Sequence, residues 1–263
     1  MKPNYKNWVP KGMVLCYLIG AVVFLIAAVV FGVIGFTQPA TWAIVLFAVS
    51  GLAAFVLAVV SAFILNMYNA FSYDGSRQLS RIIIEGVAKY VRVPDGGKCL
   101  DVGCGSGALT IAVAKRNRKA AVVGLDRWGK EYASFSQKLC EDNAKAEGVK
   151  NVSFCQGNAL QLPFEDESFD AVTSNYVYHN IPSKDRQAIL LETLRLVKKG
   201  GTFAIHDLFT ENKYGDMNSF VEKLKSMGYE KVELIDTTKG KFMTEKEAKK
   251  LFLTGSAILY GKK

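Results

Sequence analysis

Charge is missing from a long stretch of this sequence. Met13 to Tyr73 contains no Asp, Glu, Lys or Arg, so every charge lies in the first eleven residues or from Asp74 onward. The surface of a soluble domain mixes charges of both signs, and this block therefore cannot be such a surface. The whole chain carries a net charge of +9, which suits nucleic acid, an anionic membrane surface or an acidic substrate as a partner.

Two apolar runs fill the uncharged block, Val14–Phe36 and Trp42–Tyr68. Each exceeds the roughly 20 residues that an α-helix needs to cross the hydrocarbon core of a bilayer. A signal peptide has a shorter apolar region and is not followed at once by a second span. We therefore expect a hairpin of two transmembrane helices in residues 14–73, with Pro39 ending the first helix.

Basic residues flank both runs. Lys2, Lys6 and Lys11 precede the first, and Arg77 and Arg81 follow the second. Because Lys and Arg concentrate on the cytoplasmic side of membrane spans, we expect a two-pass protein of the cell membrane. Both termini, residues 1–13 and the domain formed by residues 74–263 would then be cytoplasmic.

Small residues recur at helical spacing along the two runs, and such ridges let helices approach closely in lipid. They are Ala28 and Gly32 on the first run and Ser50, Ala54, Ala58 and Ala62 on the second. Packing within the hairpin and packing in a homodimer both fit this pattern.

Cysteine and histidine are scarce. The five cysteines are scattered without a C-x-x-C pair, so we expect neither a zinc site nor a disulfide framework, and a reducing cytosol is consistent. Only two histidines are present, His179 in YVYHNIP and His206 in AIHDLF.

From Ser76 onward, short apolar runs alternate with helical patterns, which indicates an open, mostly parallel sheet covered by helices on both faces. The expected strands are 98–103, 120–126, 152–157, 169–175, 201–207, 231–237 and 256–262. The expected helices are 76–91, 107–117, 129–148, 183–199 and 217–228. Ligands of such sheets bind at the carboxyl ends of the strands.

The first expected strand runs into LDVGCGSGALT at residues 100–110. Gly103, Gly105 and Gly107 let the backbone turn sharply beside a ligand, at the amino end of the next helix. Asp101 precedes the loop and could meet an ammonium group. The same glycines fit a dinucleotide fingerprint, so an NAD site stays open at this point.

Two later positions favour an adenosine ligand. Asp126 ends the second strand about 20 residues after the loop, where an acidic side chain can hold ribose hydroxyls. Asn158 and Ala159 follow the third strand and offer an amide beside an adenine edge.

This ordered set of motifs resembles the class I S-adenosylmethionine (SAM) methyltransferases, in the branch that includes ubiquinone and menaquinone C-methyltransferases and many small-molecule and lipid methyltransferases. The resemblance runs from Ser76 to the C-terminus. It implies an α/β, Rossmann-like fold with a seven-stranded, mostly parallel sheet whose last strand, SAILYGK, is antiparallel.

The resemblance also implies a cofactor site. The loop from Asp101 to Gly107, which includes Cys104, would cradle the methionine part of SAM, and Asp126 would hold the ribose. Arg127 and Trp128 would flank the adenine, beside Ala159. The family often places an aspartate where this chain has Asn158, whose carbonyl can still accept a hydrogen bond. Asn175 completes the expected cofactor-binding set.

Both histidines fall at the carboxyl ends of strands, His179 after the fourth and His206 in the fifth. A neutral histidine there could take a proton from a methyl acceptor. The alternatives are that His179 caps a helix and that His206 satisfies a buried carbonyl. The other expected acceptor-side residues are Tyr176, Tyr178, Asn180 and Asp207, the last of which could orient an imidazole.

The sequence therefore predicts a membrane-anchored SAM-dependent methyltransferase with a small or lipophilic acceptor and no metal. The stretch SNYVYHN lacks the N/D-P-P-Y/F motif of the family's nucleic-acid amino methylases, so no nucleic-acid partner is expected. Two alternatives remain, namely a catalytically silent SAM-binding membrane subunit and, less favoured, a membrane-tethered NAD oxidoreductase.

Overall fold

The computed structural model describes residues 2–38, 40–129 and 134–263. The chain divides into two compact units. One unit is a helical hairpin, Asn7–Ser80, and the other is a domain that contains Arg81–Lys263 together with the N-terminal segment up to Lys6. The segment before the hairpin thus folds with the domain. Pro39, which we expected to end the first helix, lies outside the described residues.

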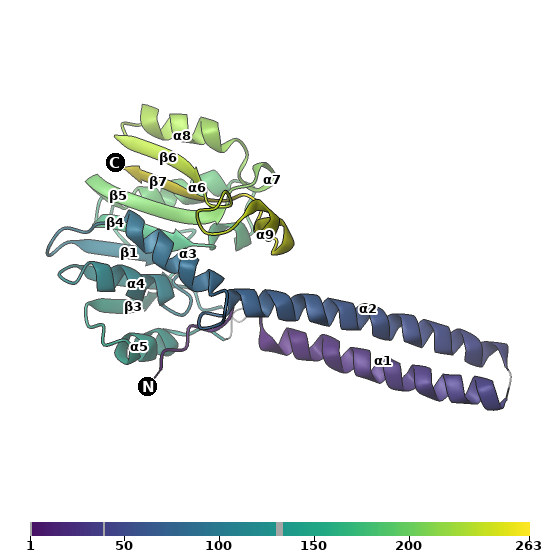
Figure 1. The fold of residues 1–263 in the computed structure, drawn as a ribbon. Helices are drawn as coiled ribbons and strands as arrows, with labels where there is room; N and C mark the ends of the chain where they lie inside the picture. Colours follow the sequence, from purple (N-terminus) through teal and green to yellow (C-terminus); the bar gives the residue numbers. More distant parts are fainter. Residues whose placement is uncertain (1, 39, 130–133) are drawn as a thin grey trace. The chain divides into compact units, whose positions relative to one another are not determined.

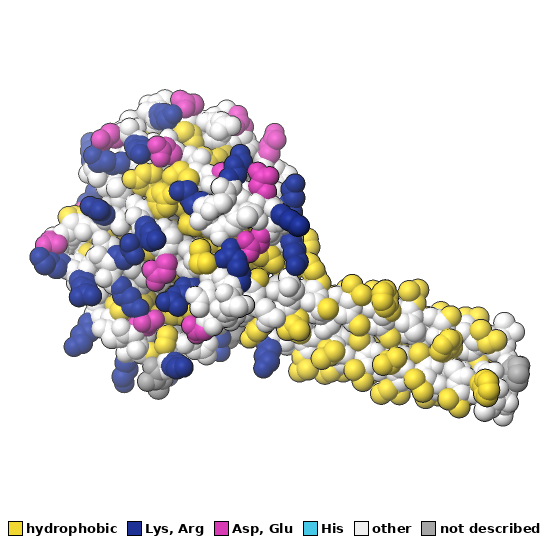
Figure 2. Space-filling view, in the orientation of Figure 1, with side chains coloured by type: hydrophobic (Ala, Val, Ile, Leu, Met, Phe, Trp, Pro, Cys, Tyr) yellow, Lys and Arg dark blue, Asp and Glu magenta, His cyan; other side chains and the backbone are white. Residues whose placement is uncertain are grey.

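The hairpin consists of helices α1 (Lys11–Thr37) and α2 (Thr41–Phe71). Both extend a few residues beyond the apolar runs seen in the sequence, and both are long and apolar enough to cross a membrane. Figure 2 shows apolar side chains along them, whereas Lys, Arg, Asp and Glu are scattered over the visible face of the domain.

Small residues line the contact between α1 and α2. Ala28, Ser50 and Ala54 are buried, and a Cβ on Gly32 would come within 3.1 Å of Phe47. Ala58 and Ala62 are exposed. Packing within the hairpin therefore accounts for part of the small-residue pattern, and a homodimer through its exposed part stays a prediction.

The domain is built on a seven-stranded sheet with the order β3-β2-β1-β4-β5-β7-β6 (Figure 1). Only β7 is antiparallel to its neighbours, as expected. The strands are β1 (Lys98–Val102), β2 (Ala121–Asp126), β3 (Val152–Gln156), β4 (Phe169–Asn175), β5 (Val197–Leu208), β6 (Lys231–Asp236) and β7 (Ser256–Lys262).

Helices cover both faces of the sheet, with α3 and α4 in front and α6 behind in Figure 1. On the α6 side, Leu190 of α6 and Phe220 of α8 pack in one apolar core with Leu100 and Phe203 of the sheet. The helices are α3 (Leu79–Val87), α4 (Ala108–Arg116), α5 (Gln137–Ala146), α6 (Arg186–Leu194), α7 (Glu211–Tyr214), α8 (Met217–Ser226) and α9 (Glu245–Lys250).

Several expected boundaries were wrong, most of all those of two helices. The helix expected over 183–199 ends at Leu194 because β5 already starts at Val197. The helix expected over 129–148 begins at Gln137 as α5, where Ser136 caps it by accepting the Leu139 N–H at 3.1 Å. Residues 130–133 of that prediction lie outside the described residues.

Candidate functional site

The loop between β1 and α4 turns through three glycines with positive φ, at 73° for Gly103, 56° for Gly105 and 80° for Gly107. L-residues with side chains rarely adopt this conformation. A Cβ on Gly103 would lie 2.3 Å from Val177, whereas a Cβ on Gly105 would meet none of the described residues within 4 Å. The backbone at Gly105 therefore faces open space, where a ligand can approach it closely.

Asp126, at the end of β2, fixes this loop. One carboxylate oxygen accepts the Gly105 N–H at 2.8 Å, and the other accepts the Trp128 N–H at 2.9 Å. The Trp128 indole in turn donates to the Gly105 carbonyl at 3.0 Å. Each carboxylate oxygen has two acceptor sites, so Asp126 retains one on each oxygen for further donors such as a pair of hydroxyls.

Asp101 lies beneath the same loop and is 1% exposed. Its oxygens accept hydroxyl hydrogen bonds from Thr110 at 2.7 Å and from Thr173 at 3.1 Å. Burial raises the pKa of Asp101 to about 7, although the two threonines act in the opposite direction. Near neutral pH, a neighbouring cation would therefore shift this carboxyl towards its charged form.

Most of the remaining residues that we expected to bind the cofactor lie within the loop or follow β2 and β3. Cys104 is buried, and its N–H donates to the Leu125 carbonyl at 3.0 Å. Arg127 and Asn158 are exposed, and Ala159 is half-buried. The Asn158 carbonyl already accepts the Leu160 N–H at 3.0 Å and keeps one acceptor site free.

His179 and Asp207 form a hydrogen-bonded pair at the carboxyl ends of β4 and β5. The His179 Nδ1 lies 2.5 Å from Asp207 Oδ1, and the side chains are 15% and 0% exposed. The Asp207 carboxylate also accepts the N–H groups of Tyr178 at 2.8 Å and Leu208 at 2.6 Å. These donors hold the carboxylate still, and the carboxylate in turn holds the imidazole.

His206 has a different setting from His179. It is fully buried, with Nδ1 2.8 Å from Asn175 Oδ1 and Nε2 3.0 Å from Thr237 Oγ1. Burial lowers the pKa of His206 to about 3, so the ring is neutral at neutral pH. Because both nitrogens are bonded inside the protein, this geometry does not support our expectation that His206 acts as a base on an acceptor. Asn175, expected to contact the cofactor, instead turns its carbonyl towards His206.

The tyrosines expected beside the acceptor also differ from each other. Tyr178 is fully buried and its hydroxyl bonds Thr193 at 2.9 Å, so it belongs to the core and not to a pocket wall. Tyr176 has a positive φ of 55°, and its ring centroid lies 6.0 Å from that of His179. Asn180 is exposed and donates to the Tyr176 carbonyl at 3.3 Å.

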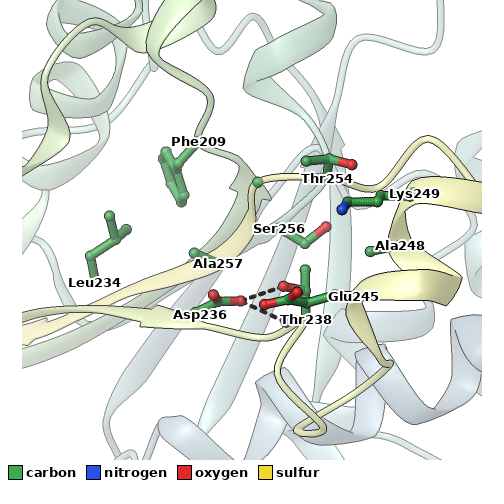
Figure 3. Close-up of a pocket in the computed structure, with 11 residues that line it drawn as sticks. Phe209, Leu234, Asp236, Thr238, Glu245, Ala248, Lys249, Thr254, Ser256 and Ala257 are labelled. Atoms are coloured by element: carbon green, nitrogen blue, oxygen red, sulfur yellow. Dashed lines mark hydrogen bonds between the residues drawn. The ribbon is translucent and has the colours of Figure 1, made fainter.

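A cavity of about 330 Å³ opens at the same edge of the sheet, between β6, β7 and α9 (Figure 3). Phe209, Leu234 and Ala257 give it an apolar wall, and Lys249 and Thr254 lie on its other side. Ser256, which also lines it, is 2.7 Å from the Tyr176 hydroxyl. Tyr176 thus connects the surroundings of His179 to this cavity.

Sequence reasoning missed several residues that shape the site. Thr110 and Thr173 bind Asp101, and Val177 packs against Gly103. Ser106, between two loop glycines, donates to the carbonyl of Tyr5 at 2.9 Å. Thr173, Val177 and Ser106 act on partners far away in the chain, so no local pattern marks them. Thr110 lies only nine positions after Asp101, within the stretch LDVGCGSGALT.

Comparisons with known proteins agree with the geometry. A family model described as a methyltransferase domain matches residues 94–252. The demethylmenaquinone methyltransferase of Geobacillus stearothermophilus is 40% identical over 116 residues, which cover 44% of this chain and 47% of that protein. The demethylmenaquinone methyltransferase of Bacillus velezensis is 30% identical over 173 residues, which cover 62% of this chain and 71% of that protein.

This chain matches only about half of the length of several such demethylmenaquinone methyltransferases. Among solved structures, the crystal structure of the [4+2]-cyclase SpnF has a TM-score of 0.54 and 20% identity, covering 73% of this chain and 85% of that one. At this identity the likeness shows the fold alone. The name of that protein, a cyclase, indicates that the fold also serves a reaction other than methyl transfer.

Proposed function

Because the chain belongs to the methyltransferase domain family, we propose that it transfers a methyl group from SAM to an acceptor at the carboxyl ends of β4 and β5. The observation that carries this proposal is the arrangement at one edge of the sheet. There, Asp126 holds the Gly105 backbone beside open space, and the His179–Asp207 pair follows the neighbouring strands.

The residues of the loop fit SAM. The free acceptor sites of Asp126 suit the two ribose hydroxyls, and the exposed amide of Asn158 suits the adenine edge. Asp101 suits the ammonium of the methionine part, since a cation would stabilise its charged form. When bound, SAM supplies the methyl group and a sulfur leaving group.

His179 is the residue that we propose to move a proton. If Nδ1 carries the hydrogen, it donates to Asp207 and leaves the Nε2 lone pair free to accept a proton. A hydroxylated aromatic acceptor would become a better nucleophile on losing a proton to Nε2. His206 cannot share this role while both of its nitrogens are bonded, and we propose that it holds Asn175 in place.

The acceptor that we propose is the reduced, quinol form of demethylmenaquinone, the quinone that the relatives' names give. The cavity beside Ser256 has an apolar wall, against which the unreactive part of the acceptor could pack.

The hairpin supports the same substrate. Helices α1 and α2, of 27 and 31 residues, span about 40 and 46 Å at ~1.5 Å per residue, enough for a hydrocarbon core of ~30 Å. A membrane anchor with its basic flanks in the cytoplasm would bring the enzyme to a membrane-dissolved acceptor.

Calorimetric titration of the full chain in detergent tests the cofactor directly. The proposal expects binding of SAM and of its product S-adenosylhomocysteine (SAH), and binding of both that is about 10- to 100-fold weaker in Asp126→Ala. Binding of NADH in place of SAM would overturn the proposal in favour of an oxidoreductase.

A catalytically silent SAM-binding subunit is the second candidate, because the features of the glycine loop that fit SAM do not by themselves require turnover. It predicts SAH binding together with a His179→Ala variant that loses no function. The methyltransferase proposal predicts that His179→Ala binds SAH normally and loses turnover.

A further inference from the structure

The N-terminal segment before the hairpin contacts the cofactor loop. Tyr5 is 6% exposed and its carbonyl accepts the Ser106 hydroxyl at 2.9 Å. Ser106 lies between Gly105 and Gly107, whose positive φ values shape the loop. A residue from the start of the chain is therefore attached to the middle of the glycine turn, 101 positions away.

A buried amide strengthens this attachment. Asn143 of α5 is 2% exposed. Its Oδ1 accepts the Asn4 N–H at 2.6 Å, while its Nδ2 donates to the Asn4 carbonyl at 3.0 Å and to the Ser106 carbonyl at 2.9 Å. Asn143 thus joins the segment and the loop through one side chain. Without the segment, this buried amide would lose two of its three hydrogen bonds, an unfavourable state.

The far end of Tyr5 is fixed as well. Its hydroxyl donates to Glu147 at 2.9 Å, and Glu147 also pairs with Lys115 at the end of α4. Burial alone would raise the pKa of Glu147, but the hydrogen bonds from Lys115 and Tyr5 outweigh it and lower the pKa. Tyr5 therefore bridges the loop at its carbonyl and the ends of α4 and α5 at its hydroxyl.

From these contacts we infer that Asn4 and Tyr5 are positioning residues of the SAM site and hold the Gly103–Gly107 loop in its binding conformation. The loop carries open backbone at Gly105, and glycine-rich turns lose much conformational entropy when they are fixed. The segment supplies that order before the cofactor arrives. The inference depends on cofactor binding alone and is independent of the proposed acceptor.

The test compares variants of the full chain by SAH calorimetry, thermal unfolding and hydrogen exchange. Deleting Pro3, Asn4 and Tyr5 while keeping Lys2 preserves the charge before the first span. We expect this deletion to raise the Kd for SAH by at least about tenfold. This is the effect of losing roughly one to two hydrogen bonds that hold the loop in its binding conformation. Tyr5→Phe removes the hydroxyl that donates to Glu147 and should raise the Kd by about threefold on the same basis. The matched control, Tyr17→Phe on the exposed surface of α1, should leave it unchanged.

Hydrogen exchange separates positioning from general stability. We expect the deletion to speed exchange in residues 103–110, with the sheet strands exchanging as in the parent, and SAH to restore slow exchange in the loop. An unchanged Kd in a folded deletion variant would overturn the inference. So would a raised Kd accompanied by faster exchange throughout the sheet and an equal fall in the melting temperature, because the segment would then act only on global stability.

Discussion

Replacing Asp207 with asparagine removes the charge that holds His179. In the parent, Asp207 Oδ1 faces His179 Nδ1 at 2.5 Å and the Leu208 N–H at 2.6 Å, while Oδ2 faces the Tyr178 N–H at 2.8 Å. Asparagine keeps only one of the two oxygens, so its NH₂ group must point at one set of donors. If it points at His179, the imidazole must accept at Nδ1 and carry its hydrogen on Nε2, where it can no longer accept a proton.

The structure sets the expected size of two effects. General base catalysis contributes about 10²- to 10⁴-fold, so kcat should fall by at least about 100-fold. Asp207 is fully buried, and losing one or two hydrogen bonds to a charged group should lower the free energy of unfolding by about 2–4 kcal/mol. Within the described residues, the Asp207 carboxylate accepts hydrogen bonds from Tyr178, His179 and Leu208, and none from the glycine loop. The Kd for SAH should therefore change by less than about threefold, below ~0.7 kcal/mol.

The assay measures kcat with saturating SAM at a temperature well below the melting point of the variant, with SAH calorimetry giving the fraction of active protein. Asp185→Asn is the matched control, since Asp185 is exposed and caps α6 by accepting the Ala188 N–H at 2.9 Å. Because asparagine caps a helix about as well as aspartate, this variant should change stability by less than about 1 kcal/mol and leave kcat unchanged. A kcat of Asp207→Asn within threefold of the parent would refute the role of the pair in proton transfer.

Three further changes test the cofactor site and the cavity. Asp126→Ala should raise the Kd for SAH about 10- to 100-fold, since hydrogen bonds to a charged group contribute roughly 1.5–3 kcal/mol. Asp95→Ala on the surface is the control and should leave the Kd unchanged. Equal affinity of the two variants for SAH, measured by calorimetry, would contradict the role of Asp126 in holding the ribose. The raised pKa of Asp101, about 7, means that the folded apo protein binds a proton that the unfolded chain releases near pH 4, so apo stability should fall as pH rises from 4 to 7. A cationic ligand favours the carboxylate, so SAM should bind more tightly as pH rises towards 7 and should release protons on binding below about pH 7. Titrations in buffers of different ionisation enthalpy should show this release, and it should vanish in Asp101→Asn. Thr254→Trp, which fills the cavity beside Ser256, should raise the KM for a quinol about tenfold with SAH affinity unchanged, an energy of ~1.4 kcal/mol; an unchanged KM would remove the cavity from the acceptor site.

Much of the fold follows from local patterns in the sequence. The apolar runs of α1 and α2, the strand–helix alternation and the glycine loop each depend on neighbours in the chain, and the antiparallel SAILYGK strand followed from the family resemblance. The structure bears out the seven-stranded sheet, with β7 antiparallel to β5. The helix boundaries near Leu194 and Gln137 were less accurate, because β5 begins earlier than its glycines suggested and Ser136 supplies the cap.

The side-chain partners could not be predicted in the same way. His206 and Asp207 are adjacent in β5, and their side chains point to opposite faces of the sheet, so Asp207 bonds His179 while His206 bonds Asn175. The sequence places both histidines at one edge but does not show which is buried. The contact of Tyr5 with Ser106 is equally invisible, since it joins residues 101 positions apart.

The most direct test of methyl transfer uses SAM with a deuterated methyl group. The full chain is reconstituted in lipid vesicles that contain demethylmenaquinone reduced to its quinol, and the lipids are extracted for mass spectrometry. We predict a quinol that carries one deuterated methyl group, detected as the quinone after oxidation by air during extraction, formed by the parent and lost in Asp126→Ala and His179→Ala. Tight SAH binding by the parent without any labelled quinone or lipid would contradict the proposed reaction and favour the silent subunit.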